Sequence, residues 1–270
     1  MQQLSMERQG AVAVVRFNNP PKGYMNATTL ADLEEMTLAL DADDAVRAVV
    51  WTGAMPGIFI RHYDTDELAA MGRALQAKGK SFSADRPLPE RNLDIIFNRL
   101  AASPKPQIAA INGTCMGGGL EFALSCDMRF AAAGDYRMGQ IEIDLAILPG
   151  AGGVVRTARM IGAARAMELC LTGEAFGPAE AARLGLVNEV VPGDVLAHAL
   201  SVATRIAAKS PRAVAHIKRI ARAANEPGDD AALTLERTLF LDLLVQPDAV
   251  QALDAYNAGT LQLTDRKVPA

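Results

Sequence analysis

Two glycine-rich segments each place a glutamate next to backbone that carries no side chain, and this pairing is suited to proton-transfer chemistry. In "CMGGGLEFALSCD", three consecutive glycines precede Glu121. In "GQIEIDLAILPGAGG", Glu142 stands in an apolar run that ends in a second glycine-rich segment. A single glutamate in an apolar run is usually ion-paired or reaches solvent with its carboxylate. Two of them, each beside a glycine-rich turn, favour a site whose carboxylates divide acid and base roles.

The spacing of the glycines excludes the common phosphate-binding loops. A dinucleotide-binding turn requires G-x-G-x-x-G and a phosphate loop requires G-x-x-x-x-G-K-[ST], and "NGTCMGGGLEF" satisfies neither. We expect a strand, "QIAAI", to lead into a glycine turn that opens a helix, which leaves backbone N–H groups free at the positive helix end. Such a point is suited to an oxyanion. The glycines alone are equally compatible with a tight turn needed only for packing.

Short apolar strands alternate with helices along the first part of the chain, which predicts an α/β fold. The strands are expected at residues 11–19, 45–53, 106–113 and 127–134. Between the first two strands we expect a helix capped by Asn26. Its polar face, predicted to be in water, comprises Asp32, Glu34 and Glu35, and its apolar stripe comprises Leu30, Leu33, Met36, Leu38 and Leu40.

The remainder of the chain is predicted to be mainly helical. From about residue 163 onward, apolar residues recur with a helical period, and Pro, Gly or Asp stand at the junctions between segments. Residues 71–89 have weak periodicity and contain Gly, Ser and Pro, which is typical of a mobile surface excursion.

Composition and charge limit the classes of function. The chain has 270 residues, 50% of them hydrophobic, and a formal net charge of -4, with no basic stripe that would favour nucleic acid. No apolar run approaches the ~20 residues that a membrane-spanning helix needs. The N-terminus lacks a secretory signal pattern, so we expect a cytoplasmic protein. The three cysteines are too few and too irregularly spaced for a disulfide framework or a zinc site; we expect them in the core and predict no metal.

The stretch "KPQIAAINGTCMGGGLEFALSCDMRFAA", followed by "GQIEIDLAILPGAGGVVR", resembles the crotonase, or enoyl-CoA hydratase/isomerase, superfamily. The resemblance extends from the N-terminal strand into the helical tail. It implies a crotonase-like spiral of repeated ββα units, with the active site, over residues 1–200 and a C-terminal helical oligomerisation region over residues 201–270. It also implies a homotrimer or hexamer and an acyl-CoA substrate, with no cofactor because CoA is part of the substrate.

The resemblance also implies an oxyanion hole. In the family, the thioester carbonyl oxygen lies between two backbone N–H donors, and the matching donors here are those of Gly118 and Tyr63. Tyr63 belongs to "FIRHYD", where relatives carry smaller residues. The bulk of His62 and Tyr63 is therefore interpreted either as pointing away from the site or as shaping the acyl pocket.

The hydratase branch of the family has glutamates at the positions that match Glu121 and Glu142. The implied enzyme is a hydro-lyase that adds water across the 2,3 double bond of an enoyl-CoA thioester through a stabilised enolate. Glu142 is assigned as the acid that protonates C2, and Glu121 as the residue that activates water. In an alternative assignment, the two glutamates share both roles. Double-bond isomerisation, thioester hydrolysis and carbon–carbon cleavage stay open as alternatives, with His62 or Asp144 as accessory groups. If the segment is extended, Asp144 shares a face with Glu142.

Further positions match segments that bind substrate or CoA in the family. They are Lys22, Tyr24, Met25, Ile60, His62, Asp64 and Gly117. Arg266 and Lys267 in the C-terminal tail are interpreted as contacts for a CoA phosphate or as a solvated end. One branch of the family binds RNA through lysines on the first helix, but here that helix carries acidic residues, which repel phosphate.

Overall fold

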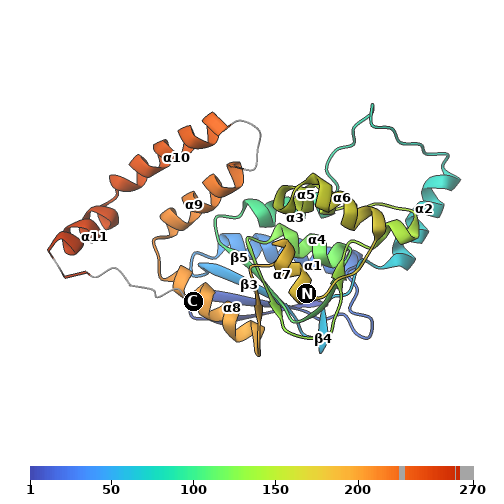
Figure 1. The fold of residues 1–270 in the computed structure, drawn as a ribbon, viewed down its shortest axis with the longest axis horizontal. Coiled ribbons are helices and arrows are strands. Elements are labelled where there is room, and N and C mark those ends of the chain that lie inside the picture. Colours follow the sequence, from blue (N-terminus) through green and yellow to red (C-terminus); the bar gives the residue numbers. More distant parts are fainter. Residues whose placement is uncertain (225–228, 259, 262–270) are drawn as a thin grey trace. The chain divides into compact units, whose positions relative to one another are not determined.

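The computed structural model describes residues 1–224, 229–258 and 260–261 (Figure 1). Its internal contacts divide the chain into two compact units, Met1–Ala208 and Lys209–Ala270. The boundary predicted at residue 200 falls within helix α8 (Val195–Ala207) of the first unit. Arg266 and Lys267 lie outside the described residues.

Two sheets organise the first unit. The larger sheet contains, in spatial order, β1 (Leu4–Gln9), β2 (Val12–Phe17), β3 (Ala48–Gly53), β5 (Gln107–Ile111), β7 (Met128–Ala132) and β9 (Glu189–Val191). The smaller sheet contains β4 (Gly57–Ile60), β6 (Gly113–Met116) and β8 (Met138–Gly139). Only the β1–β2 pair is antiparallel among the strand pairs of the described residues.

Successive strands alternate between the two sheets, so the chain winds as a spiral. β3, β5 and β7 enter the larger sheet, and each is followed by a strand of the smaller sheet. The helices of this unit that precede α8 are α1 (Ala27–Ala42), α2 (Thr65–Ala77), α3 (Asn92–Ala102), α4 (Gly118–Ser125), α5 (Gly153–Ile161), α6 (Ala163–Thr172) and α7 (Pro178–Leu184), with a short 3₁₀ helix η1 (Glu142–Leu145). The predicted α/β fold of repeated ββα units is confirmed.

Both faces of the central strands β2, β3 and β5 are buried, which explains the continuous apolar runs in their sequence. Alternate residues point to opposite faces: Trp51 joins the core between the sheets and helices, while Val50 packs with Ala199 of α8 on the other face. The Phe122 ring of α4 meets Trp51 edge-on, with centroids 5.2 Å apart. It meets Phe17 in the same way at 5.0 Å. These edge-to-face contacts hold α4, and therefore its glycine-rich start, in one orientation.

The other end of α4 is held by Arg129, a buried residue of β7. Its guanidinium donates to the carbonyl oxygens of Ala123 at 3.3 Å and Cys126 at 2.8 Å. A positive charge at a helix C-terminus complements the helix dipole and bonds carbonyls that have no partner within the helix. Cys115, Cys126 and Cys170 are buried, as predicted, and none of the three forms a disulfide.

Helix α1 departs from the predicted faces at two positions. Asn26 caps it as expected, accepting from the Thr29 N–H. Asp32, however, is buried and not in water, because its Oδ2 accepts backbone N–H bonds from Gln2 at 2.7 Å and Gln3 at 2.6 Å. Leu38 is 52% exposed rather than part of the apolar stripe. The partners of Asp32 come from the start of the chain, so periodicity within the helix could not reveal them.

The predicted surface excursion is shorter than residues 71–89. Helix α2 continues to Ala77, so Met71 lies inside a helix, and only residues 78–90 form an exposed segment of turns before α3. The second unit contains α9 (Pro211–Ala223), α10 (Asp229–Leu244) and α11 (Pro247–Asn257), in agreement with the predicted helical tail. In the described parts of the chain, no helix combines the length and hydropathy required to cross a membrane.

Candidate active site

The glycine triplet forms the turn between β6 and α4. The sequence predicted that "QIAAI", which is β5, would lead into this turn, but an additional strand, β6, lies between them. Gly117 has a φ of +49°, a backbone conformation that side-chain-bearing residues rarely adopt. A Cβ on Gly119 would lie only 2.2 Å from the Ile60 carbonyl oxygen. The triplet is therefore required both by a positive φ and by the close approach of β4.

Two backbone N–H groups, those of Gly118 and Tyr63, lie side by side at this turn. Gly118 is the first residue of α4, so its N–H has no partner within the helix. Tyr63 pairs with Met25, whose N–H donates to the His62 carbonyl at 2.9 Å and whose carbonyl accepts from the Asp64 N–H at 2.8 Å. In such a parallel pairing the Tyr63 N–H points away from Met25.

The Tyr63 N–H faces Gly118. A Cβ on Gly118 would lie 3.5 Å from the Tyr63 nitrogen. Neither amide donates a hydrogen bond to another group of the described residues. The two N–H groups are therefore available to a ligand oxygen at the positive end of a helix.

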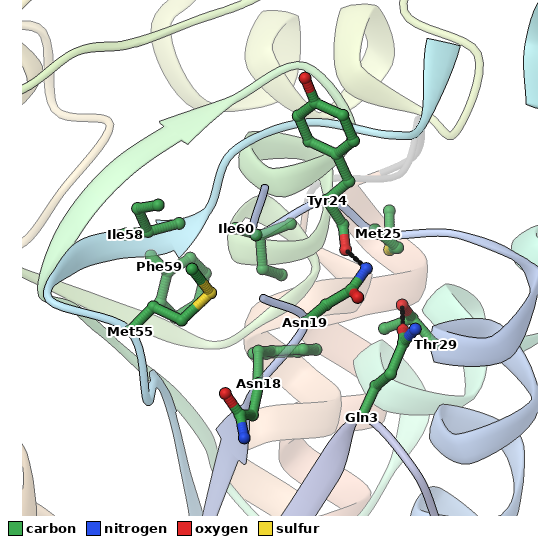
Figure 2. A pocket seen from close by; sticks show the side chains of 12 residues that line it. Gln3, Asn18, Asn19, Tyr24, Met25, Thr29, Met55, Ile58, Phe59 and Ile60 are labelled. Carbon is green, nitrogen blue, oxygen red and sulfur yellow. Dashed lines mark hydrogen bonds between the residues drawn. The ribbon is translucent and has the colours of Figure 1, made fainter. Parts of the chain in front are cut away.

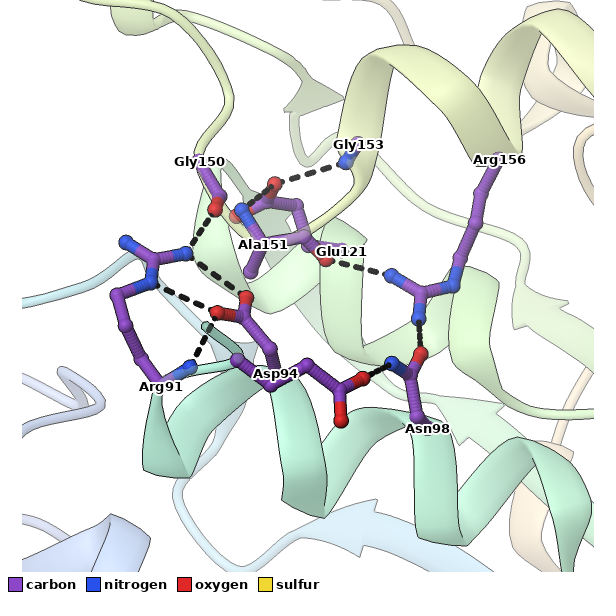
Figure 3. Close-up of polar contacts among 9 residues, drawn as sticks. Arg91, Asp94, Asn98, Glu121, Gly150, Ala151, Gly153 and Arg156 are labelled. Carbon is purple, nitrogen blue, oxygen red and sulfur yellow. Dashed lines mark hydrogen bonds and ion pairs between the residues drawn. The ribbon is translucent and has the colours of Figure 1, made fainter. Parts of the chain in front are cut away.

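Glu121 is a buried carboxylate one turn into α4. Its Oε1 accepts from the backbone N–H of Ala151 at 2.6 Å and of Gly153 at 2.9 Å. Burial raises the pKa of Glu121, whereas these two bonds and the positive charges of Arg156 and Arg91 oppose the rise. The two backbone N–H groups thus orient the carboxylate, and both of them bind the same oxygen, Oε1 (Figure 3).

Glu142, the first residue of η1, approaches the same turn from the other segment. Its Oε1 lies 2.9 Å from the position that a Cβ on Gly117 would take. Its Oε2 is buried and has no hydrogen-bond partner among the described residues. Burial, together with the charge of Glu121, raises the pKa of Glu142 to about 7. A carboxyl group with this pKa exchanges protons readily near neutral pH.

Gln140 was missed by the sequence reasoning, although it stands two residues before Glu142 in the segment already singled out. Its side chain is buried, and within the described residues neither its Nε2 nor its Oε1 has a partner. A Cβ on Gly153 would lie 2.5 Å from Gln140 Nε2 and 2.9 Å from Glu121 Oε1. Its amide therefore belongs to the surroundings of the Glu121 carboxylate.

His62 lies beside the glycine turn and is fixed by two contacts. Its Nδ1 is 2.7 Å from the Tyr63 carbonyl oxygen, which only accepts, so Nδ1 carries the proton and Nε2 is the acceptor in the neutral ring. The ring stacks on Tyr24 with centroids 4.3 Å apart. The Lys22 ammonium lies 5.2 Å from the Tyr24 ring centroid. Three residues predicted to bind substrate or CoA are thus neighbours.

A small cavity lies behind this segment and is lined in part by Tyr24, Met25 and Ile60 (Figure 2). Asn19 Nδ2 donates to the Tyr24 carbonyl at 2.8 Å on its wall. Met25 also reaches toward the oxyanion side, because its Cε lies 2.9 Å from the position of a Cβ on Gly118. Its side chain is therefore positioned between this cavity and the glycine turn.

The two remaining predicted acids have other surroundings. Asp64 caps α2, and its carboxylate accepts from the Asp66 N–H at 2.9 Å. Asp144 does not share a face with Glu142, because the segment forms the 3₁₀ helix η1 and not an extended strand. Its Oδ1 lies 3.2 Å from the position of a Cβ on Gly173, at the end of α6. No set of three or more potential metal ligands is grouped in the described ranges.

Comparison with known proteins agrees with this fold. The family model described as enoyl-CoA hydratase/isomerase matches residues 7–259. The short-chain-enoyl-CoA hydratase of Clostridium acetobutylicum is 34% identical over 253 residues, 93% of each chain. The 2,3-dehydroadipyl-CoA hydratase of Escherichia coli is 33% identical, covering 95% of this chain and 96% of the relative. A solved enoyl-CoA hydratase structure from Geobacillus kaustophilus superposes with a TM-score of 0.85 at 28% identity, over 98% of both chains.

The spiral α/β fold and these relatives define an enzyme of the hydratase-like lyase type. Within that class, this chain belongs to the enoyl-CoA hydratase/isomerase family. The resemblance inferred from the two glycine-rich segments is therefore confirmed.

Proposed function

We propose that this chain is an enoyl-CoA hydratase, which adds water across the 2,3 double bond of an enoyl-CoA thioester. The observation that carries the proposal is the meeting of four groups at one glycine turn. Two are the unbonded N–H groups of Gly118 and Tyr63. The others are the carboxylates of Glu121 and Glu142, which influence each other electrostatically. The hydratase names of the two relatives support the same reaction.

The two N–H groups stabilise the negative charge that develops during addition. When water adds at C3, electron density moves onto the thioester oxygen and produces an enolate. Donors fixed in place before the reaction stabilise such an oxyanion without reorganisation, and a single donor typically contributes about 10²–10³ in rate. Because Gly118 begins α4, the helix dipole adds to this effect.

The two glutamates differ in their hydrogen-bond partners, as separate acid and base roles require. Glu121 has one oxygen held by two backbone donors, which orients the other to bind and deprotonate the attacking water. Glu142, with a pKa raised to about 7 and a carboxylate oxygen without a protein partner in the described residues, delivers the proton to C2. The hydroxyl group thus goes to C3 and a proton to C2, and both carboxyl groups are restored by exchange with solvent. No cofactor is needed for these steps.

The names of the relatives do not specify a single acyl group for the substrate. The names of the two relatives specify different acyl groups at nearly equal identity to this chain, short-chain enoyl and 2,3-dehydroadipyl. In this chain the stacked rings of Tyr24 and His62 stand beside the glycine turn and restrict the space next to it. We therefore assign the choice of acyl group to the wall formed by Tyr24 and His62.

A homotrimer or hexamer, in a cytoplasmic location, is part of the same proposal. Large apolar side chains are exposed next to the site: Leu145 is 57% exposed, and Leu148 and Leu171 are each 68% exposed. On the second unit, Phe240 is 61% and Val245 73% exposed. Clusters of this kind mark interaction surfaces, and contact between copies of the chain would bury them.

The proposal is tested with a panel of 2-enoyl-CoA thioesters of increasing chain length, which includes aromatic and branched members. Hydration of each member is measured as the loss of the conjugated thioester absorbance. We expect hydration of at least one member, and a change in chain-length preference in the His62→Ala variant. Parallel incubation with 3-enoyl-CoA separates hydration from isomerisation. Robust isomerisation without hydration of any member would refute the assignment.

A further inference from the structure

The loop that holds Glu121 is itself held by two arginines from outside the glycine turn (Figure 3). Arg91 Nη2 donates to the Gly150 carbonyl oxygen, and Arg156 Nη1 donates to the Ala151 carbonyl oxygen. The Gly150 carbonyl and the Ala151 N–H belong to the same planar peptide unit. One peptide therefore accepts from Arg91 on one side and donates to Glu121 Oε1, at 2.6 Å, on the other.

This arrangement orients the loop that donates to Glu121 and strengthens the first of its two donors, the Ala151 N–H. A cation at a peptide oxygen polarises the peptide and makes its N–H a stronger donor, as in other hydrogen-bond chains. Arg156 fixes the next peptide in the same way through Ala151, directly before the Gly152–Gly153 peptide that supplies the second donor. Consecutive peptides of the loop are thus held by two separate side chains.

Both arginines are in turn held by α3. Asp94 accepts from Arg91 Nε at 2.8 Å and from Nη2 at 2.8 Å, a bidentate ion pair. Asn98 Oδ1 accepts from Arg156 Nη2 at 2.9 Å. Helix α3 therefore sets the position of both guanidinium groups, and through them the position of the loop.

We propose that Arg91 and Arg156 are positioning residues for Glu121. Arg91 fixes and polarises the peptide that supplies the first donor to its carboxylate, and Arg156 fixes the peptide that lies between the first donor and the second. They touch neither of the N–H groups proposed to bind the thioester oxygen, and they act through the loop 150–153. The inference rests on the proposed function, because it assumes that Glu121 takes part in the reaction.

Both arginines also favour the ionised form of Glu121, since their positive charges lower its pKa. The other titratable groups that interact with this carboxylate are Glu142 of η1 and Cys170 of α6, while Asp94 pairs with Arg91. Loss of either arginine thus raises the pKa of Glu121. If its ionised form activates water, the acidic limb of the kcat profile then moves to higher pH.

The test measures kcat and KM for 2-enoyl-CoA hydration in Arg91→Met and Arg156→Met, each in the wild-type and the Glu121→Gln background. The matched control is Arg183→Met, which removes another arginine from an i,i+3 ion pair, with Glu180 on α7. We expect a roughly 10- to 100-fold fall in kcat with KM changed less than about twofold, because a misplaced catalytic group costs rate more than binding. The control keeps wild-type kcat.

The Glu121→Gln background separates positioning from general damage. If the arginines act through Glu121, their removal causes no further loss of kcat once that carboxylate is gone. Arg156→Lys keeps a donor and a charge and should recover part of the rate. Where a Met variant does not fold by circular dichroism, Asn98→Ala releases Arg156 without deleting it, and we expect an intermediate fall in kcat.

Two outcomes overturn the inference: unchanged kcat in the arginine variants, or an equal fall in kcat with and without the Glu121 carboxylate. Failure of the proposed function has a different signature, because then the wild type would hydrate no 2-enoyl-CoA, whereas failure of the Glu121 role alone would leave Glu121→Gln with the wild-type rate. The two failures are therefore distinguishable in one set of measurements.

Discussion

Glu142 Oε1 lies 2.9 Å from the position that a Cβ on Gly117 would occupy, so the carboxylate and the glycine share one small space. The backbone of Gly117, with a φ of +49°, independently disfavours any side chain. The two requirements have different consequences, since strain lowers stability while displacement of Glu142 lowers activity.

Gly117→Ala separates these consequences. The methyl group strains the backbone and pushes the Glu142 carboxylate away, and a misplacement on the order of 1 Å costs about 10²-fold in rate. Gly185→Ala is the matched control, because Gly185 has a φ of +83° and a Cβ there would meet no other atom within 4 Å. Thermal unfolding should show destabilisation in both variants, and steady-state kinetics a large fall in kcat only in Gly117→Ala. Equal activities in the two variants would contradict the contact with Glu142.

Gly118→Pro tests the backbone donor at the start of α4. Proline at the first position of a helix is well tolerated; it removes the N–H and places a ring carbon on the same nitrogen. Gly118→Ala is the control: it adds a Cβ in the same place, 3.3 Å from Tyr63 Cβ, but keeps the donor. We expect kcat for hydration to be about 10²–10³ lower in the proline variant than in the alanine variant. Similar rates would exclude a role for this N–H.

Glu142 should make the stability of the fold depend on pH. Burial raises its pKa from 4.5 to about 7, so the folded chain holds this proton more tightly than the unfolded chain. Its contribution is fully present below about pH 4.5 and is lost as the pH rises through about 7. Glutamine has no proton to lose, so Glu142→Gln lacks this dependence.

Urea unfolding at about pH 5 and pH 8 measures the effect. Between these values, the free energy of unfolding of the wild type should fall by about 1–2 kcal/mol relative to Glu142→Gln, since solvent around the exposed part of the side chain screens the full effect. Glu35→Gln, at an exposed position of α1, should follow the wild type. Parallel curves for wild type and Glu142→Gln would contradict the raised pKa.

The sequence predicts those features whose residues stand close together along the chain. The α/β class follows from alternating strands and helices, whereas the spiral follows from the resemblance to the crotonase superfamily. Gly118, Glu121 and Glu142 stand in two short segments whose pattern is specific to that resemblance. Each of these positions is reached by counting along the chain from a glycine turn. The fold and the family are confirmed, whereas the catalytic roles of the site residues stay predictions.

Features that depend on distant partners escaped the sequence reasoning. The burial of Asp32 is not predicted because its partners are 28 to 30 residues away, at the start of the chain, which local periodicity does not connect to α1. Arg91 binds Gly150 across 59 residues, so neither residue signals the other. Gln140 could have been predicted as a site residue, because an amide two residues before Glu142 in an apolar segment is unusual, and the structure buries it.

The most direct test of the central claim is kcat for 2-enoyl-CoA hydration in wild type, Glu121→Gln and Glu142→Gln, with Asp144→Asn as the control because η1 turns that carboxylate toward α6. Each glutamine variant should lose at least about 10²-fold in kcat, the lower end of the range for a positioned acid or base, while the control retains the wild-type rate. Near-wild-type hydration by either glutamine variant would contradict the account.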